Sequence, residues 1–121
     1  MNGGTGDGAG AGWPAMIAAL PAPDLAFGRD AVRAHLLTGG PRQVVFFAFP
    51  ADLEVPEHSH GAQWGVVVEG HITITIAGET RRYGPGDSYF IPAGSPHSAR
   101  AEAGCRLIDV FEAPDRYRPA D

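Results

Sequence analysis

The sequence contains no lysine, only one cysteine and no long apolar run, and each of these shortages excludes a class of function. All nine basic residues are arginines, so Schiff-base chemistry, a P-loop lysine and the kinase lysine are impossible. Cys105 stands alone and can form neither an internal disulfide nor part of a cysteine zinc cluster, so we interpret it as a structural thiol. No apolar stretch approaches the roughly 20 residues that a membrane-spanning helix needs. The N-terminus lacks the features of a signal peptide, and we expect a soluble, cytoplasmic protein.

Charge and composition narrow the fold and the partners. The net charge of −5, without a basic stripe, argues against nucleic-acid binding. A length of 121 residues with 44% hydrophobic content fits one compact domain. Seventeen glycines and eleven prolines, spread along the chain, favour many short elements joined by tight turns over a helical bundle.

The chain divides into three expected segments. Residues 1–12 are glycine-rich and have almost nothing to bury, which predicts a disordered leader. Residues 13–113 are expected to form a single barrel domain, and residues 114–121 a polar C-terminal tail. At the start of the domain, residues 13–20 are expected to form one or two helical turns that end at the following prolines.

From residue 42 onward, short β-type runs alternate with glycine or proline turns, and no helical segment intervenes. This pattern is typical of an all-β sandwich or barrel. Residues 30–37 fit a short helix or a strand, and their alternating apolar positions favour the strand. The apolar run at 44–49 is expected to be buried on both faces. Further strands are expected at 63–68, 71–76, 79–83, 88–91, 97–101 and 105–112.

Two dipeptides, Glu69-Gly70 and Ala77-Gly78, are typical of tight hairpin turns and set an expected register. The first hairpin would pair 63–68 with 71–76. Because side chains alternate across a strand, one face of this pair is almost entirely apolar and is the expected barrel interior. Its members are Gln63, Gly65, Val67, Ile72, Ile74 and Ile76.

The opposite face of these strands is half apolar and carries Trp64. We expect it to pack under a terminal segment or against a second subunit. The second hairpin places Arg81 and Tyr83 opposite the interior isoleucines. We expect Arg81 to reach solvent at a barrel corner, although inside the barrel it would be an anion clamp, and we expect Tyr83 to pack in the core.

Three of the five histidines fall in two clusters that suit a metal site. His58 and His60 are two positions apart, and on an extended strand both imidazoles point the same way. Gln63 points inward by the register argument, and a buried amide needs a partner. His97 follows the turn-rich segment 92–96. The alternative is that these histidines are polar residues of a wetter strand face or of a loop.

The remaining histidines are not expected to be ligands. His71 lies on the opposite face by register, and His35 is far from the clusters in sequence. Asp87 is expected to be a turn residue of the segment Gly-Pro-Gly-Asp.

In these clusters the sequence resembles the cupin family. The first cupin motif runs HxH, a short gap, Glu, six residues and Gly, and it is matched here by His58, His60, Gln63 and Gly70. The second motif runs Gly, five residues, Pro-x-Gly, two residues and His, and it is matched by Gly86, Pro92, Gly94 and His97.

The resemblance implies an antiparallel jelly-roll barrel that is frequently dimeric and holds one divalent metal ion. The implied ligands are His58, His60, Gln63 and His97. The sequence departs from the family pattern in three ways: Gln63 replaces Glu, the gap before it is one residue shorter, and Ala101 stands where a polar residue is often found. Alternatively, Gln63 hydrogen-bonds the backbone and leaves a three-histidine site.

A glutamine in place of the glutamate changes the expected chemistry. Three neutral imidazoles and a neutral amide leave the charge of the ion uncompensated, which favours an anionic oxygen ligand such as a carboxylate, enolate or phenolate. Glutamine cannot take a proton at neutral pH, so the usual carboxylate base is missing and no catalytic residue is assigned. Imidazole suits Fe, Mn, Ni, Cu or Zn, and the sequence does not choose among them.

The sequence therefore predicts a metal-binding, single-domain cupin and a homodimer. We expect it to act on a small anionic, oxygen-rich molecule by dioxygenase-like or isomerase-like chemistry. The alternatives are a non-catalytic small-molecule sensor or storage module and a metal-free structural cupin.

Overall fold

The computed structural model describes residues 12–26 and 31–120. Apart from Gly12, the expected leader lies outside the described residues. The described residues contain one short helix, α1 (Ala15–Ala18), and nine strands. The strands are β1 (Arg33–Leu37), β2 (Gln43–Ala48), β3 (Leu53–His58), β4 (Gln63–Glu69), β5 (Ile72–Ile76), β6 (Glu79–Tyr83), β7 (Ser88–Ile91), β8 (His97–Ala101) and β9 (Arg106–Phe111).

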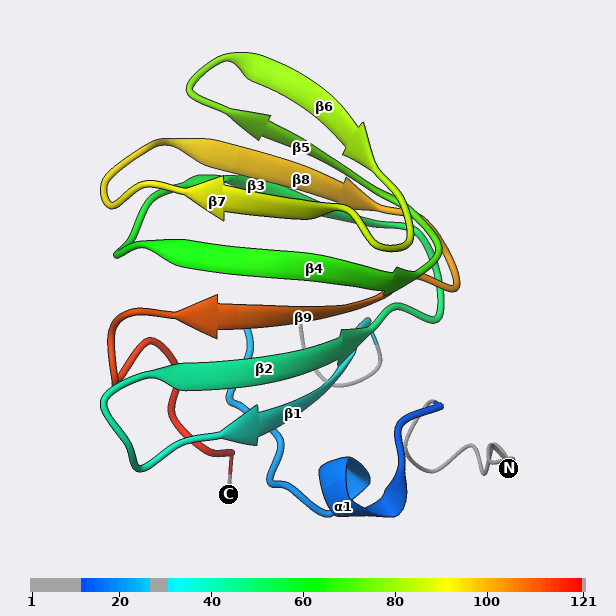
Figure 1. Cartoon of the computed structure of the whole chain (residues 1–121), viewed down its shortest axis with the longest axis vertical. Coiled ribbons are helices and arrows are strands. Elements are labelled where there is room, and N and C mark those ends of the chain that lie inside the picture. Colours follow the sequence, from blue (N-terminus) through cyan, green and yellow to red (C-terminus); the bar gives the residue numbers. More distant parts are fainter. Residues whose placement is uncertain (1–11, 27–30, 121) are drawn as a thin grey trace.

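The strands form two antiparallel sheets that curve around a common interior (Figure 1). One sheet has the order β1-β2-β9-β4-β7 and the other the order β3-β8-β5-β6. Several neighbours in a sheet are distant in sequence, as in the pairing of β4 with β9, whereas β1–β2 and β5–β6 are consecutive strands. The expected all-β, antiparallel jelly-roll barrel is confirmed.

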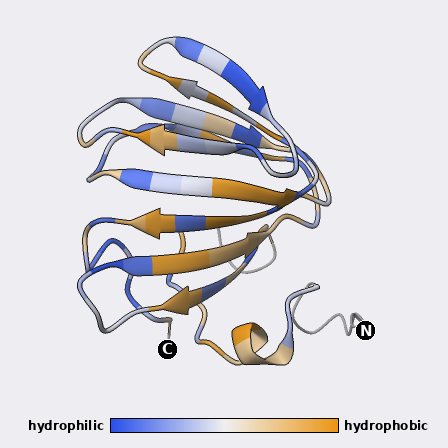
Figure 2. Ribbon diagram, viewed as in Figure 1, coloured by the Kyte–Doolittle hydropathy of each residue, from blue (hydrophilic) through white to orange (hydrophobic). Residues whose placement is uncertain are grey.

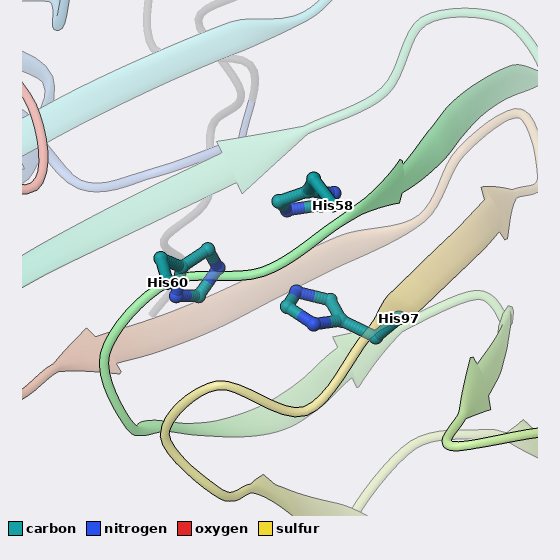
Figure 3. Close-up of side chains that lie close together, drawn as sticks. All are labelled: His58, His60 and His97. Atoms are coloured by element: carbon teal, nitrogen blue, oxygen red, sulfur yellow. The ribbon is translucent and has the colours of Figure 1, made fainter.

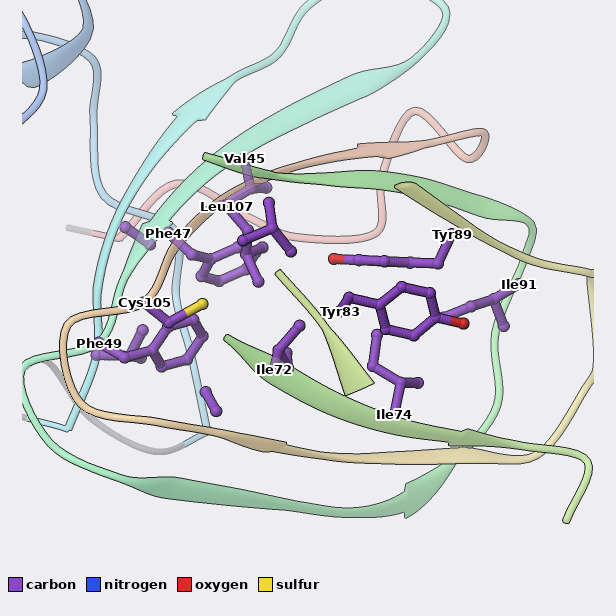
Figure 4. Packing of buried hydrophobic residues seen from close by; sticks show 14 of the residues in the cluster. Val45, Phe47, Phe49, Ile72, Ile74, Tyr83, Tyr89, Ile91, Cys105 and Leu107 are labelled. Atoms are coloured by element: carbon purple, nitrogen blue, oxygen red, sulfur yellow. The ribbon is translucent and has the colours of Figure 1, made fainter. Parts of the chain in front are cut away.

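The core lies between the sheets and comes from alternate positions of each strand (Figures 2 and 4). Along β9, half-buried and buried residues alternate over all six positions. Leu107 and Val45 from one sheet belong to the same buried cluster as Ile72 and Ile74 from the other. Each such burial contributes about 1.5–3 kcal/mol, which makes the alternating strand pattern the main determinant of the fold.

The expected interior face is confirmed. Gln63, Gly65, Val67, Ile72 and Ile74 are buried, and Ile76 is half-buried. On the other face Trp64 is exposed, while Val66 and the threonines of β5 are half-buried.

The predicted hairpin between 63–68 and 71–76 is wrong. The strand β4 pairs with β7 and β9, whereas β5 pairs with β6 and β8 in the other sheet. The chain changes sheets at Gly70, which has a φ of 75°, and a Cβ there would lie 2.7 Å from Cα of Cys105. The interior assignment still holds, because alternation runs along each strand and both sheets turn their inner faces to one core.

The second predicted hairpin is confirmed. Ala77 and Gly78 both have positive φ, at 49° and 85°, as a two-residue turn of this kind requires. Tyr83 lies opposite Ile72 and is buried. Arg81 is exposed, with its guanidinium carbon 5.6 Å from the centre of the Tyr83 ring.

The strand β3 was not predicted as a separate element. None of its six residues is fully buried: half-buried and exposed residues alternate only as far as Pro56. Proline has no N–H for a ladder, but β3 is an edge strand and its pairing with β8 shifts between Val55 and His58. The shift brings His58 directly opposite His97.

The N-terminal elements agree with expectation, with one correction. The short helix and the strand at the end of 30–37 are both present. The run 44–49 is fully buried on its inner face, whereas on the outer face Ala48 is buried and Val44 and Phe46 are only half-buried. Trp13 covers Phe46, with the two ring centroids 5.4 Å apart, so a terminal segment packs on this part of the sheet.

Smaller expectations are also met. Cys105 is fully buried, and burial raises the pKa of its thiol to about 12, as a structural thiol requires. Asp87 is a turn residue whose Oδ2 accepts a hydrogen bond from the Gly84 N–H at 2.8 Å. No helix among residues 12–26 and 31–120 is long and apolar enough to span a membrane.

Candidate metal centre

Three histidines converge at one end of the barrel (Figure 3). His58 ends β3, His60 lies in the loop that follows, and His97 begins β8. Their ring centroids are 4.2 to 5.2 Å apart, and one nitrogen of each lies within 4.8 Å of the others. This spacing lets three imidazoles contact one ion.

Backbone carbonyls fix the tautomer of all three rings. Nδ1 of His58 lies 2.9 Å from the Pro56 oxygen, Nδ1 of His60 lies 2.7 Å from the Gly61 oxygen, and Nδ1 of His97 lies 2.9 Å from the Ser95 oxygen. A carbonyl oxygen can only accept, so Nδ1 carries the hydrogen in each ring. Nε2 then carries the free electron pair and can bind a metal ion. Metal-binding histidines use this arrangement.

The turn before β8 positions two of the histidines. The Gly94 N–H donates to the His60 oxygen at 2.8 Å, and the Ser95 oxygen accepts from His97. Gly94 has a φ of 79°, which favours glycine at this point of the turn. The second sequence motif therefore orders both sides of the cluster.

Burial favours the neutral form of two of the three rings, His60 and His97. Burial, together with the charge of Arg116 and the neighbouring histidines, lowers the pKa of His60 to about 4, although its backbone hydrogen bond acts in the opposite direction. Burial also lowers the pKa of His97. Ring nitrogens that lie this close together, two of them on imidazoles that burial holds neutral, fit a divalent transition metal ion.

Gln63 lies in the same cavity, on β4. A side-chain hydrogen bond joins it to Asp109, where it helps to hold down the pKa of that carboxyl. The ionised Asp109 carboxylate can only accept, so the NH₂ group of Gln63 is the donor in this bond. His71 and His35 are not part of the histidine cluster.

Asp109 is a functional candidate that the sequence analysis missed. It is a buried carboxyl in the middle of β9, lines the cavity, and accepts a hydrogen bond from the Tyr89 hydroxyl at 2.7 Å. Burial raises its pKa to about 6, while the hydrogen bonds from Tyr89 and Gln63 act to lower it. Its signal was present in the sequence, because Asp109 stands at an inward position between Leu107 and Phe111.

Gly65 makes room for this pair. In the sheet it lies between Tyr89 on β7 and Asp109 on β9. A Cβ at this position would clash with both the Asp109 carboxylate and the Tyr89 ring. The side chains of Tyr89 and Asp109 therefore fill the space that a side chain at position 65 would need, and they form their hydrogen bond there.

Arg116 is a second residue that the sequence analysis missed, since it falls in the segment expected to be a polar tail. It lines the cavity, and its guanidinium stacks 4.4 Å from the centre of the Tyr117 ring. Its Nε is buried and has no hydrogen-bond partner among the described residues. A buried donor without a partner is costly, which suits a site that receives an anion.

The cavity has a volume of about 560 Å³. Its charged and polar lining residues are the three histidines, Gln63, Asp109, Arg116, Arg118, Asp24 and Glu57. Its remaining lining is largely apolar and includes Phe47, Phe49, Leu53, Ile72, Ile74 and Leu107. The volume and the few converging polar groups suit a small molecule.

The chain is similar to known proteins along most of its length. A family model described as a cupin domain, Cupin_2, matches residues 45–111. A protein named H2HPP isomerase from Bacillus subtilis is 30% identical over 93 residues, which are 75% of this chain and 39% of that protein. The chain thus spans about two fifths of the length of this relative.

Two solved structures share the fold. The structure of KdgF from Halomonas sp. has a TM-score of 0.66 and 28% identity, over 78% of this chain and 86% of that chain. Salicylate 1,2-dioxygenase from Pseudoaminobacter salicylatoxidans, in complex with gentisate, has a TM-score of 0.62 and 26% identity, over 70% of this chain and 26% of that chain.

The histidine cluster predicts which substitutions abolish metal binding. We expect His97→Ala to remove most of the bound metal after loading, because it deletes one of three converging donors. His71→Ala is the matched control and should retain the wild-type metal content. Elemental analysis of untagged protein measures both, and equal losses in the two variants would show that the cluster is not the site.

The raised pKa of Asp109 predicts that this residue makes the folded protein more stable at low pH than at neutral pH. Its folded-state pKa lies above the usual 3.8, so the folded protein binds this proton more tightly than the unfolded chain. The resulting stability is present at low pH and is lost as pH rises through about 6. Relative to Asp109→Asn, which keeps an acceptor for Tyr89, wild-type protein should gain about 1 kcal/mol of unfolding free energy between about pH 7.5 and about pH 5.

Urea unfolding of both metal-free proteins at the two pH values measures this difference. His60 titrates in both proteins, so its contribution cancels. If the free energy of unfolding changed by the same amount between the two pH values in wild-type protein and in Asp109→Asn, that result would contradict the raised pKa of Asp109.

Proposed function

This chain belongs to the cupin family, and from that premise we propose that it is a metal-dependent enzyme acting on a small anionic, oxygen-rich molecule. One observation carries the proposal: one ring nitrogen of each of the three histidines lies within 4.8 Å of the other two, in a cavity that also holds the unpartnered Nε of Arg116. A cation site and a buried cationic donor in one cavity suit a ligand with anionic oxygen atoms.

His58, His60 and His97 would hold one divalent transition metal ion, with the oxygen of Gln63 as a fourth ligand. The three neutral rings and the amide leave the charge of the ion uncompensated, so an anionic oxygen ligand is favoured. When bound, the ion would supply Lewis-acid polarisation of that ligand. Fe, Mn, Ni, Cu and Zn all suit such a donor set.

Asp109 would hold and move a proton. Its carboxyl faces the cavity with a pKa of about 6, so near neutral pH it exists in both protonation states. A group of this kind can take a proton from a bound molecule and return it elsewhere. This supports an isomerase-like proton shift as the leading reaction, as does the similarity to a protein named isomerase.

Deuterium exchange tests this proposal. The metal-loaded protein, incubated with 2-oxobutanoate in D₂O, should incorporate deuterium at the carbon beside the carbonyl and consume no oxygen. Asp109→Asn should slow this exchange by about 100-fold, because a positioned acid–base group contributes about that factor. NMR follows the exchange, and metal-free protein and Arg81→Met serve as controls.

The other outcomes are equally informative. Oxygen consumption with this or another small carboxylate would replace the isomerase-like reaction with the dioxygenase-like one. Tight binding of such carboxylates without turnover would favour the sensor or storage module instead. Wild-type protein that takes up no metal would contradict the proposal.

A homodimer is proposed from the outer face of the five-stranded sheet. Trp64, Val68 and Phe90 are 42%, 39% and 58% exposed, and Trp64 lies directly opposite Phe90 in the pairing of β4 with β7. Neighbouring large apolar side chains on a sheet face suit a second copy of the chain. A cytoplasmic location is proposed as well, since a lone reduced thiol is ordinary there, and cell fractionation tests it.

The double substitution Trp64→Glu with Phe90→Glu should convert the dimer to a monomer, because it places two like charges in the apolar contact. Met16→Glu is the matched control, since Met16 is 79% exposed and lies on α1 rather than on β4 or β7. Sedimentation velocity measures the oligomeric state. A monomeric wild-type protein, or a dimer that survives the double substitution, would contradict the proposed interface.

A further inference from the structure

We propose that Gln43 is a positioning residue, which fixes Arg116 at the cavity through the main chain of Tyr117. The inference rests on the proposed function, because it concerns the same anion site. Gln43 does not itself line the cavity. It would act only by holding the segment that carries the arginine.

The side chain of Gln43 binds the main chain of Tyr117 at two points. Its NH₂ group donates to the Tyr117 oxygen at 2.8 Å, and its oxygen accepts from the Tyr117 N–H at 2.9 Å. A second hydrogen of the NH₂ group goes to the Thr38 hydroxyl at 2.9 Å. The amide thus pairs with Tyr117 as a peptide group would in a strand ladder, and only 1% of Gln43 is exposed.

The C-terminal segment needs such a contact because it belongs to neither sheet. It turns back after β9, as the red trace in Figure 1 shows, and contains no strand of its own. Beyond Tyr117 it pairs with the N-terminal segment: the Asp24 N–H donates to the Arg118 oxygen at 2.7 Å, and the Ala120 N–H donates to the Ala22 oxygen at 2.8 Å. Gln43 therefore supplies the hydrogen bonds that tie this segment to the barrel next to Arg116, beside the packing of the Tyr117 ring on Phe111.

Arg116 depends on the placement of this main chain. Its guanidinium stacks on the Tyr117 ring and lies 5.8 Å from the centre of the Phe111 ring. Stacking restrains the plane of the guanidinium but still lets the group slide across the face of the Tyr117 ring. Its Nε has no hydrogen-bond partner among the described residues. A shift of Tyr117 would move both the ring and the charge, so the affinity for an anion should depend on Gln43.

The test compares metal-loaded wild-type protein with Gln43→Glu, Arg116→Met and Arg81→Met. Salicylate is the anionic probe, and salicylamide is its neutral isostere. The Gln43→Glu change keeps the size of the side chain but replaces the donor to the Tyr117 oxygen with a carboxylate oxygen. Metal content is measured in every sample, and hydrogen exchange of the Tyr117 amide is measured without the probe.

We expect Arg116→Met to weaken salicylate binding by about 10- to 100-fold, the effect of losing a charge-assisted hydrogen bond. At about pH 8, Gln43→Glu should weaken it by about tenfold, with metal content and salicylamide binding unchanged. The Tyr117 amide should exchange faster in this variant. Arg81→Met should match wild-type protein throughout, because Arg81 is exposed and outside the cavity.

Lowering the pH separates positioning from a general loss of structure. The introduced carboxyl is buried, so it should take up a proton as pH falls towards about 6 and regain a donor for the Tyr117 oxygen. The ratio of wild-type to variant affinity should then return towards one. A defect of folding would not be repaired in this way. Should Gln43→Glu fail to fold, Thr38→Val removes one bond from the amide and should weaken salicylate binding by about two- to threefold.

The outcomes distinguish this inference from the function on which it rests. Equal salicylate affinity in wild-type protein and Gln43→Glu at both pH values would overturn the positioning role alone. A loss in that variant that does not recover at low pH, or that accompanies metal loss, would overturn it too. Wild-type protein that holds metal but binds salicylate no better than salicylamide would overturn the anion site, and the role of Gln43 with it.

Discussion

Three backbone carbonyls determine which nitrogen each imidazole of the cluster leaves free. The oxygens of Pro56, Gly61 and Ser95 each lie within two residues of the histidine they bind. The orientation of every ring is therefore set by local chain geometry, before any ion is present. Convergence of the rings is set by long-range pairing, because β3 and β8 place His58 opposite His97. The metal chemistry of the site depends on both conditions at once.

A buried polar layer lies next to this cluster. Gly65 leaves the space in which Tyr89 and Asp109 form their hydrogen bond, and Gln63 joins the same carboxyl. These polar side chains occupy inward positions of the barrel that apolar side chains would otherwise fill. In the proposed function this layer would supply the proton-holding group that a glutamine in the first motif cannot supply. The carboxyl that the sequence motif lacks is thus present on another strand, beside the cluster rather than within it.

Much of the fold and part of the site could be predicted from sequence, and the failures have physical causes. Inner and outer faces were assigned correctly because alternation is a property of a single strand. The β4–β5 hairpin was wrong because a two-residue turn signal does not reveal whether the chain stays in one sheet or, as at Gly70, crosses to the other. The strand β3 was missed because its alternation is short, contains a proline and buries none of its residues fully. The three histidines could be predicted because they lie in two recognisable sequence motifs. Arg116 reaches the cavity only because the C-terminal segment folds back onto the barrel, and no local sequence pattern reveals that.

The central claim is that His58, His60 and His97 present Nε2 to one ion. Nitrogen-15 NMR of the imidazoles, recorded during titration with zinc as a diamagnetic probe, tests it most directly. In metal-free protein the three rings should show a protonated Nδ1 and an unprotonated Nε2, and zinc at one equivalent should shift Nε2 of these three alone. Shifts at Nδ1, shifts at His71 or His35, or no response to zinc would contradict the account.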